Sequence, residues 1–163
     1  MSRWMKIVIG IIVIVLDVSC DQITKSVVRS EVISGERIDL IKNHLILTKV
    51  ENTGAFLSFG DHWIEPIKIF FLIALPIVFL IIGLYFMIKW SNRNIWLILS
   101  IGFVVGGGIG NMIDRVLYQS VTDFLHIRMG PIQSGIFNMA DVSIIIGMGI
   151  LLIYLTRGRL RPI

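Results

Sequence analysis

The sequence predicts a membrane protein of the all-α class, a four-helix bundle with a small β-structure on one side of the membrane. Of its 163 residues, 55% are hydrophobic and only 16% are charged, with a mean hydropathy of +0.85. Soluble domains are about a quarter charged, and a soluble fold of this size could not hide so much apolar surface. The apolar residues also gather into four segments close to the roughly 20 residues that cross a bilayer core.

The four predicted spans differ in how completely they are apolar. They cover approximately residues 7–28, 67–88, 95–115 and 140–156. Within the second span, Ile69 to Ile88 carries no charge and one proline, which a membrane helix tolerates. The last third of the first span instead carries Asp17, Asp21 and Lys25. No linker or repeat interrupts residues 1–163, so one integral membrane domain is expected.

The charges at the ends of the spans predict the topology. An even number of spans places both termini on one side of the membrane. The termini and the connection between the second and third spans hold seven cations and no acid: Arg3, Lys6, Lys89, Arg93, Arg157, Arg159 and Arg161. Because positively charged loops stay in the cytoplasm, both termini are expected there. The pI near 9.5 thus reflects topology, and no nucleic-acid partner is expected.

The two remaining segments, residues 30–65 and 117–138, are expected to be extracytoplasmic. The first alternates apolar and polar residues at 37–41 and 44–50, which predicts a small β-structure resting on the membrane surface. The second contains a Gly130-Pro131 turn signal. Three aromatic residues later in the first segment are compatible with an interfacial belt and equally with a cover over a cleft: Phe56, Phe59 and Trp63.

The residue types exclude a disulfide framework and argue against a metal site. A single cysteine, Cys20, cannot form an intramolecular disulfide or a multi-cysteine metal site. The three histidines lie far apart in the sequence and lack ligand spacing: His44, His62 and His126. We therefore expect no metal and no cofactor.

Topology brings the polar residues of the spans to one depth. Asp21 lies about 22 Å along the first helix from Lys6, in the outer leaflet. The third span ends and the fourth begins on that same side. Their polar residues join this layer: Asn111, Asp114 and Arg115 in the third, Asn138 and Asp141 in the fourth. Ionisable residues within a membrane are costly and usually mark function.

Structural alternatives exist for single members of this layer. Asp21 and Lys25 have the i,i+4 spacing of an ion pair within one helix, and this interpretation is favoured over a catalytic one. Asn138, three residues before Asp141, resembles a helix N-cap. Such alternatives do not explain why four separate stretches converge. The recurring glycines of the third span predict close helix packing: Gly102, Gly106 and Gly110, with Gly107 and Gly108 between.

Five blocks of the sequence carry a family resemblance. They are Asp21-Gln-Ile-Thr-Lys25, Glu51-Asn52-Thr-Gly54-Ala-Phe56, Gly107-Gly-Ile-Gly-Asn111-Met-Ile-Asp114-Arg115, Val121-Thr-Asp123-Phe124 and Phe137-Asn138-Met-Ala-Asp141. In this order they resemble the signature blocks of bacterial lipoprotein signal peptidases (signal peptidase II), and they span about three quarters of the chain.

The resemblance implies a four-helix fold with cytoplasmic termini and an extracytoplasmic β-cradle. It implies a metal-independent aspartic endopeptidase of the bacterial cytoplasmic (inner) membrane, with its active site at the extracytoplasmic face. The implied reaction removes signal peptides from diacylglyceryl-modified prolipoproteins by cleavage before the lipidated cysteine. These substrates and membrane lipid are the expected partners, and a monomer is expected.

Site residues are carried over by position. Asp123 and Asp141 form the implied catalytic dyad. The implied substrate-binding and dyad-orienting residues are Asn52, Gly54, Asn111, Arg115 and Asn138, and the implied supporting residues are Asp21, Lys25 and Asp114. Two positions depart from the family pattern: Gln119 stands where glycine is common, and His126 stands where a second acid is common. Both departures bear on the shape of the outer loop and on substrate fit.

Paired aspartates suit peptide hydrolysis because close carboxylates share one proton. One member can activate water while the other donates a hydrogen bond to the scissile carbonyl. Asp141, at the start of a helix, is favoured as the anion. Partial burial would raise the pKa of Asp123, so we expect Asp123 to be the protonated partner. Arg115 and the neighbouring amides are candidates to stabilise the oxyanion.

Two other classes of membrane protein compete with a peptidase. A small proton-coupled carrier would place its acids near the midplane and show symmetry between its halves, whereas here the polar residues lie off-centre and the halves differ. A non-enzymatic scaffold would use the same polar layer only to hold helices together.

Overall fold

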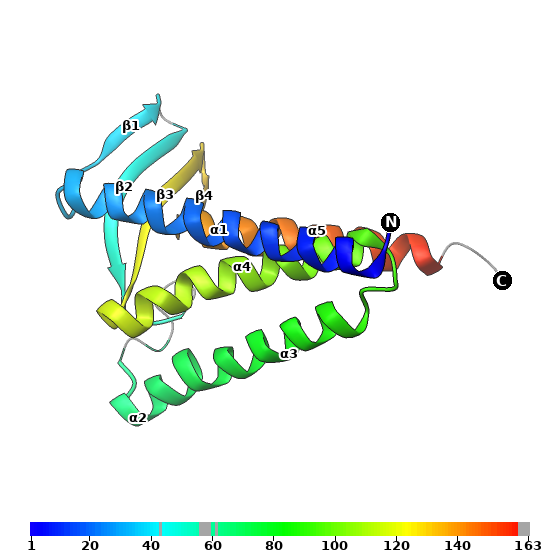
Figure 1. Ribbon diagram of the computed structural model, residues 1–163. Helices are drawn as coiled ribbons and strands as arrows, with labels where there is room; N and C mark the ends of the chain where they lie inside the picture. Colours follow the sequence, from blue (N-terminus) through cyan, green and yellow to red (C-terminus); the bar gives the residue numbers. More distant parts are fainter. Residues whose placement is uncertain (43, 56–59, 61, 160–163) are drawn as a thin grey trace.

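The computed structural model describes residues 1–42, 44–55, 60 and 62–159, with helices running side by side and a small sheet at one end (Figure 1). In chain order the elements are α1 (Arg3–Glu31), β1 (Ile38–Ile41), β2 (Leu45–Asn52), α2 (Glu65–Lys68), the π-helical segment η2 (Ile69–Ala74), α3 (Leu75–Lys89), α4 (Ile95–Tyr118), β3 (Val121–Met129), β4 (Ile132–Phe137) and α5 (Met139–Arg159). Within the described residues, four helical stretches are long and apolar enough to cross a membrane: Arg3–Glu31, Glu65–Lys89, Ile95–Tyr118 and Met139–Thr156. The prediction of four helices able to span a membrane is confirmed for these residues.

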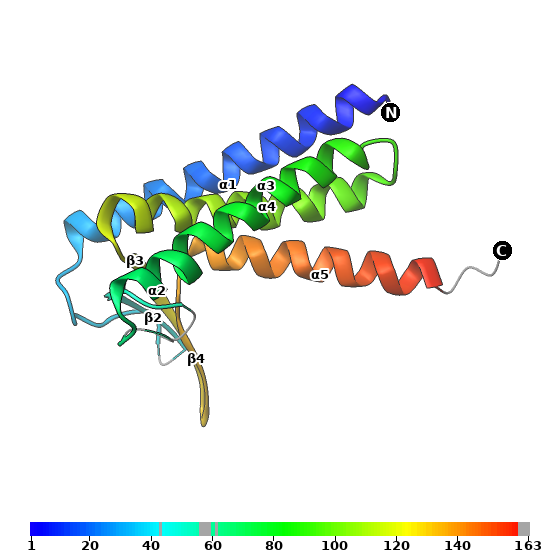
Figure 2. The same cartoon turned by 90° about the horizontal axis from the view of Figure 1, so that it is seen from below.

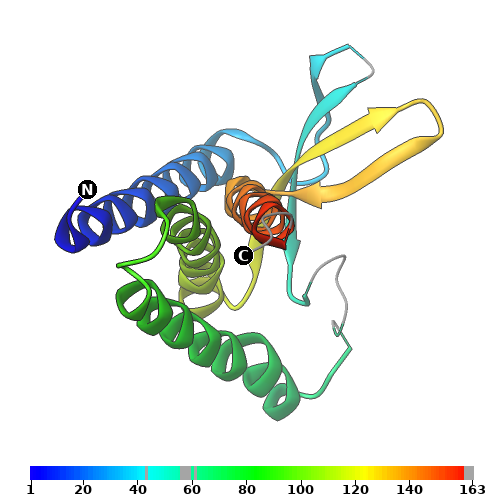
Figure 3. The same ribbon diagram turned by 90° about the vertical axis from the view of Figure 1, so that its right-hand side faces the viewer.

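Helix α4 forms the centre of the bundle. It packs against α5, α1 and α3, which surround it when the bundle is viewed from its end (Figure 3). More than half of the α4 span is buried (56%), whereas the other three spans are at most 17% buried. The start of α1 and the end of α5 lie at the end of the bundle away from the sheet (Figure 2). The polar residues of α4 are therefore enclosed by helices, and the apolar outer faces of the other spans remain for lipid.

The sheet is antiparallel, with strand order β1-β2-β3-β4. The register of β2 and β3 sets Asn52 opposite Val121 and Val50 opposite Asp123. The sequence pattern predicts strands only in the first outer segment, so β3 and β4 are additional to the prediction. Apolar residues do alternate along β3 from Leu125 to Met129, which is the signal that indicates this strand.

Local turns position the strand that carries Asp123. Helix α4 ends at Gln119, whose φ of 58° lies in the left-handed region that favours glycine. The family departure at this position therefore puts a residue with a side chain where the backbone favours glycine. The turn signal at Gly130-Pro131 is confirmed, because Gly130 has a φ of 60° between β3 and β4.

A continuous helical stretch runs through α2, η2 and α3. The wider π-helical turns of η2 precede Pro76, which has no N–H to continue the α-helical hydrogen bonds. Near the start of this stretch, the ring of Trp63 lies 5.5 Å from that of Phe71. Phe56 and Phe59 lie outside the described residues, so their role as a belt or a cover stays a prediction.

The glycines of α4 face three different helices, with Gly108 against Leu80 of α3 and the others against α1 and α5. A Cβ added at Gly102 would lie 3.3 Å from the carbonyl oxygen of Gly10, and one at Gly106 would lie 2.8 Å from the Asp17 side chain. Gly102 and Gly106 thus let α1 approach. A Cβ on Gly107 would collide with the carbonyl oxygen of Ala140 on α5. The prediction of close helix packing is confirmed, and Gly107 sets the separation of the two helices that carry the polar site.

Gly107→Ala is expected to destabilise the protein by about 1–3 kcal/mol, because a fixed backbone oxygen blocks the added methyl group. The matched control is Gly149→Ala in α5, where an added Cβ meets nothing within 4 Å. This control should be neutral or gain up to about 1 kcal/mol from helix propensity. Thermal unfolding in detergent checks both variants, and equal melting temperatures would contradict the close α4–α5 contact.

Candidate active site

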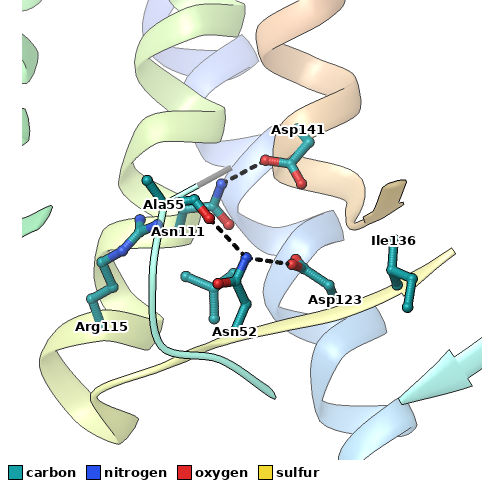
Figure 4. Close-up of a pocket in the computed structure, with 8 residues that line it drawn as sticks. Asn52, Ala55, Asn111, Arg115, Asp123, Ile136 and Asp141 are labelled. Atoms are coloured by element: carbon teal, nitrogen blue, oxygen red, sulfur yellow. Dashed lines mark hydrogen bonds between the residues drawn. The ribbon is translucent and has the colours of Figure 1, made fainter. Parts of the chain in front are cut away.

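A small pocket opens where the sheet meets the ends of α4 and α5 (Figure 4). Its volume is about 60 Å³, room for roughly two water molecules at their liquid volume. The lining residues come from separate elements of the chain: Asn52, Ala55, Asn111, Arg115, Val121, Asp123, Ile136 and Asp141. Five predicted site residues therefore line one pocket, and the apolar members Ala55, Val121 and Ile136 were not anticipated.

The first turn of α5 places Asp141 at the pocket. The side-chain oxygen of Asn138 accepts a hydrogen bond from the backbone N–H of Asp141 at 3.1 Å, and the Asn138 N–H donates to Asp141 Oδ2 at 3.1 Å. These reciprocal bonds form a capping box, so the N-cap interpretation is confirmed. Asp141 lines the pocket, and Asn138, fully buried beside it, caps the same helix, so forming the helix also positions Asp141.

Asp123 is held between two asparagine amides. Asn52 Nδ2 donates to its Oδ2 at 3.0 Å, and Asn138 Nδ2 donates to its Oδ1 at 2.7 Å. Only 5% of Asp123 is exposed. Burial raises the pKa of Asp123 to about 6, and the nearby charge of Asp141 adds to this while the two amide bonds oppose it. Such a pKa suits a group that holds and releases a proton near neutral pH.

Asn111 connects Asp141 to Asn138. Its Nδ2 donates to Asp141 Oδ1 at 2.9 Å, while its Oδ1 accepts from Asn138 Nδ2 at 3.1 Å. Asn138 thus contacts Asp123, Asp141 and Asn111 together. The two carboxylates belong to one hydrogen-bonded unit whose donors are amide groups, which do not change charge with pH.

Arg115 lines another side of the pocket and is bonded to Gly54. Arg115 Nη2 donates to the Gly54 carbonyl at 3.3 Å, and the Gly54 N–H donates to Asn52 Oδ1 at 3.0 Å. The guanidinium also interacts electrostatically with Asp123 and Asp141. A fixed cation beside two carboxylates can stabilise negative charge that develops on a substrate oxygen.

A buried ion cluster lies beneath this unit. Lys25 Nζ is 2.8 Å from Asp21 Oδ2 and 3.2 Å from Asp114 Oδ2, and all three side chains are fully buried. Asp21 Oδ1 accepts a hydrogen bond from the Ala140 N–H at 2.9 Å, which ties α1 to the start of α5. The interpretation of Asp21–Lys25 as an ion pair is confirmed, but the pair reaches beyond its own helix.

The sequence patterns do not predict several polar partners of this ion cluster. Arg29 is 2.7 Å from Asp114 Oδ1 and donates to Thr122 Oγ1 at 2.8 Å. Thr122 Oγ1 in turn donates to Glu51 at 2.9 Å, linking α1 to β3 and β2. Arg29 lies four residues after Lys25, so helical spacing was the available signal. His126, the other family departure, is absent from the described residues that line the pocket.

No group of three or more His, Cys, Asp or Glu side chains suited to holding a metal ion occurs in the described part of the chain. The groups that the site offers for chemistry are two carboxylates, the amides of Asn52, Asn111 and Asn138, and one guanidinium. This set can transfer protons and stabilise an oxyanion.

The four membrane-capable helices and this carboxylate pocket define a membrane enzyme of the hydrolytic type. Residues 11–157 match the model of the family described as signal peptidase (SPase) II. The chain belongs to that family, which is a family of peptidases.

Relatives and solved structures agree with this assignment. The chain is 36% identical over 139 residues to the lipoprotein signal peptidase of Listeria monocytogenes serovar 1/2a and, equally, to that of Listeria welshimeri serovar 6b. Each match covers 84% of this chain and 86% of the relative. A solved structure described as a bacterial membrane enzyme has a TM-score of 0.82 at 30% identity, covering 93% of this chain and 89% of that one. A second has a TM-score of 0.80 at 32% identity, covering 90% and 91%.

Asp123→Asn is expected to flatten the pH dependence of stability. A raised pKa means that the folded protein binds this proton more tightly than the unfolded chain does. The resulting stabilisation is complete below the ordinary pKa of 3.8 and is lost as pH rises through about 6. Between pH 4.5 and 7.5, the wild type should lose roughly 2 kcal/mol more unfolding free energy than the variant. Thermal unfolding of both proteins at the two pH values measures this difference, and equal losses would contradict it.

Proposed function

We propose that the protein is an intramembrane aspartic endopeptidase that removes signal peptides from diacylglyceryl-modified prolipoproteins by cleavage before the lipidated cysteine. The observation that carries the proposal is the shared contact of Asn138 with Asp123 and Asp141. Family membership provides the class of substrate, and this pair of carboxylates supplies a means of hydrolysis.

Asp141 is the proposed base. Its two oxygens accept hydrogen bonds from the Asn111 amide and the Asn138 N–H, and it lies in the first turn of α5, where the helix dipole favours an anion. Asp123, whose pKa is raised by burial, is the proposed proton donor. The different environments of the two carboxylates support these separate roles.

In the proposed hydrolysis, each aspartate both gives up and takes up one proton over two steps. Asp141 takes a proton from water as the water oxygen adds to the scissile carbonyl carbon, and Asp123 gives its proton to the carbonyl oxygen. Asp141 next delivers its proton to the amide nitrogen as the C–N bond breaks, and Asp123 recovers a proton from one hydroxyl of the intermediate. Arg115 stabilises negative charge on the carbonyl oxygen. The pair returns to its starting protonation state.

The remaining site residues have proposed positioning roles. Asn52 and Gly54 hold Asp123 and Arg115, whereas Asn111 and Asn138 orient both carboxylates. The ion cluster of Asp21, Lys25 and Asp114 supports these residues from below.

We propose a topology with both termini in the cytoplasm and the sheet and pocket outside the bacterial cytoplasmic membrane. The cationic ends of the chain support it, as does the common position of the start of α1 and the end of α5 (Figure 2). The chain forms one integral membrane domain with spans at approximately 7–28, 67–88, 95–115 and 140–156. It acts as a monomer surrounded by lipid. A signal peptide is itself a membrane helix, so an outer-face pocket meets its scissile bond at the membrane surface.

Asp123→Asn and Asp141→Asn should each reduce cleavage of a diacylglyceryl-modified prolipoprotein by at least about 10²–10⁴-fold, because each removes one proton-transfer group. The assay uses purified protein in lipid with EDTA present, and cleavage is read by gel shift. Asp39→Asn, on the exposed strand β1, is the matched control and should cleave normally. Full activity in either dyad variant would refute the assignment of the pair.

Cysteine labelling tests the topology. In a Cys20→Ser background, Gln133→Cys on β4 and Asn92→Cys between α3 and α4 each introduce one exposed thiol. A membrane-impermeant maleimide should label the first variant in intact spheroplasts and the second only after permeabilisation, because loop charge keeps the latter inside. The reverse pattern would place the pocket in the cytoplasm.

A further inference from the structure

The ammonium group of Lys25 reaches the pocket through the side chain of Asn111. Lys25 Nζ donates to Asn111 Oδ1 at 2.9 Å, in addition to its contacts with Asp21 and Asp114. Its three N–H donors therefore match three oxygen acceptors, and the side chain is fully buried. An ion pair with Asp21 alone would not require the contact with Asn111.

An asparagine amide can present either its oxygen or its NH₂ group to a neighbour. An ammonium group has donors only, so Lys25 accepts only the oxygen of Asn111 as its partner. The NH₂ group must then face Asp141, where it donates at 2.9 Å. A reversed amide would place NH₂ against the ammonium of Lys25 and oxygen against the carboxylate of Asp141, and both contacts would be repulsive. Asn138 donates to the same oxygen and reinforces this orientation.

We propose that Lys25 is a positioning residue for hydrolysis, which orients and polarises the Asn111 amide so that its NH₂ group supports Asp141 as the base. This inference rests on the proposed function. A cation bonded to the amide oxygen strengthens the donor at the other end of the same amide. Lys25 thereby acts on Asp141 through Asn111, without belonging to the reacting groups.

The charges around this relay determine the design of the test. Lys25 faces Asp21 from its own helix, Asp114 from α4 and Asp123 from β3. Replacing Lys25 alone would leave buried carboxylates unbalanced and could unfold the protein. Two further cations complete the set: Arg29 pairs with Asp114, and Arg115 faces both carboxylates of the pocket.

The test compares two double variants of equal charge, Asp21→Asn/Lys25→Met and Asp21→Asn/Lys25→Gln. Each removes one acid and one cation, but only glutamine keeps an N–H donor for Asn111. The methionine variant should lose about 10- to 100-fold in kcat/KM, and the acid limb of its pH–rate profile should move to higher pH. The glutamine variant should recover much of both. Equal activity and equal pH profiles of the two variants would overturn the positioning role.

A single variant, Asn111→Asp, provides a second test of the proposal if the double variants do not fold. It retains an oxygen for Lys25 but puts a carboxylate in place of the donor to Asp141, so kcat/KM should fall in protein that thermal unfolding shows to be folded. Full activity of Asn111→Asp would overturn the relay.

Wild type and Asp123→Asn accompany every assay with the same diacylglyceryl-modified prolipoprotein. Failure of the wild type to cleave would reject the proposed function. Cleavage by wild type alone, with no difference between the two Lys25 variants, would reject only the role of Lys25.

Discussion

The structure depends on one buried cation placed between two carboxylates. Lys25 lies 2.8 Å from Asp21 and 3.2 Å from Asp114, within helices that are expected to be surrounded by lipid. An unpaired charge in such a layer would be very costly, so the depth of α1 relative to α4 is strongly constrained. Asp21 also accepts the N–H of Ala140. The same cluster therefore fixes where α5 begins, and with it the position of Asp141.

Next to this cluster, the side-chain amides of Asn111 and Asn138 join the buried ion pairs and the start of α5 to the two carboxylates of the pocket. Asn138 caps α5 and donates to Asp123, while Asn111 accepts from Lys25 and donates to Asp141. Each carboxamide uses both of its ends, which fixes its orientation. Amide donors can hold two acids without neutralising either one, so the proton that the proposed hydrolysis requires remains free to move. Asn111 and Asn138 therefore both stabilise the packing of the helices and hold the side chains of Asp123 and Asp141 in place.

Much of this arrangement is predictable from local patterns. Composition and apolar length identify the four membrane helices, and helical spacing identifies the Asp21–Lys25 pair. A three-residue interval identifies the capping box of Asn138 and Asp141. Strands β3 and β4 and the contacts of Arg29 escaped prediction. Short strands give weak sequence signals, and a side chain that bridges separate elements shows no periodicity of its own.

The sequence by itself determined the class of protein and the depth of its polar residues, because hydrophobic length and helical rise are properties of single segments. Family resemblance added Asp123 and Asp141 as the implied pair. Only the tertiary structure decided which donors meet which oxygens. The contact of Asn52 with Asp123 depends on the register of β2 against β3, and that of Asn111 with Asp141 depends on the close approach allowed by Gly107. Such contacts join residues far apart in the chain, so they exist only once the helices and the sheet have packed together.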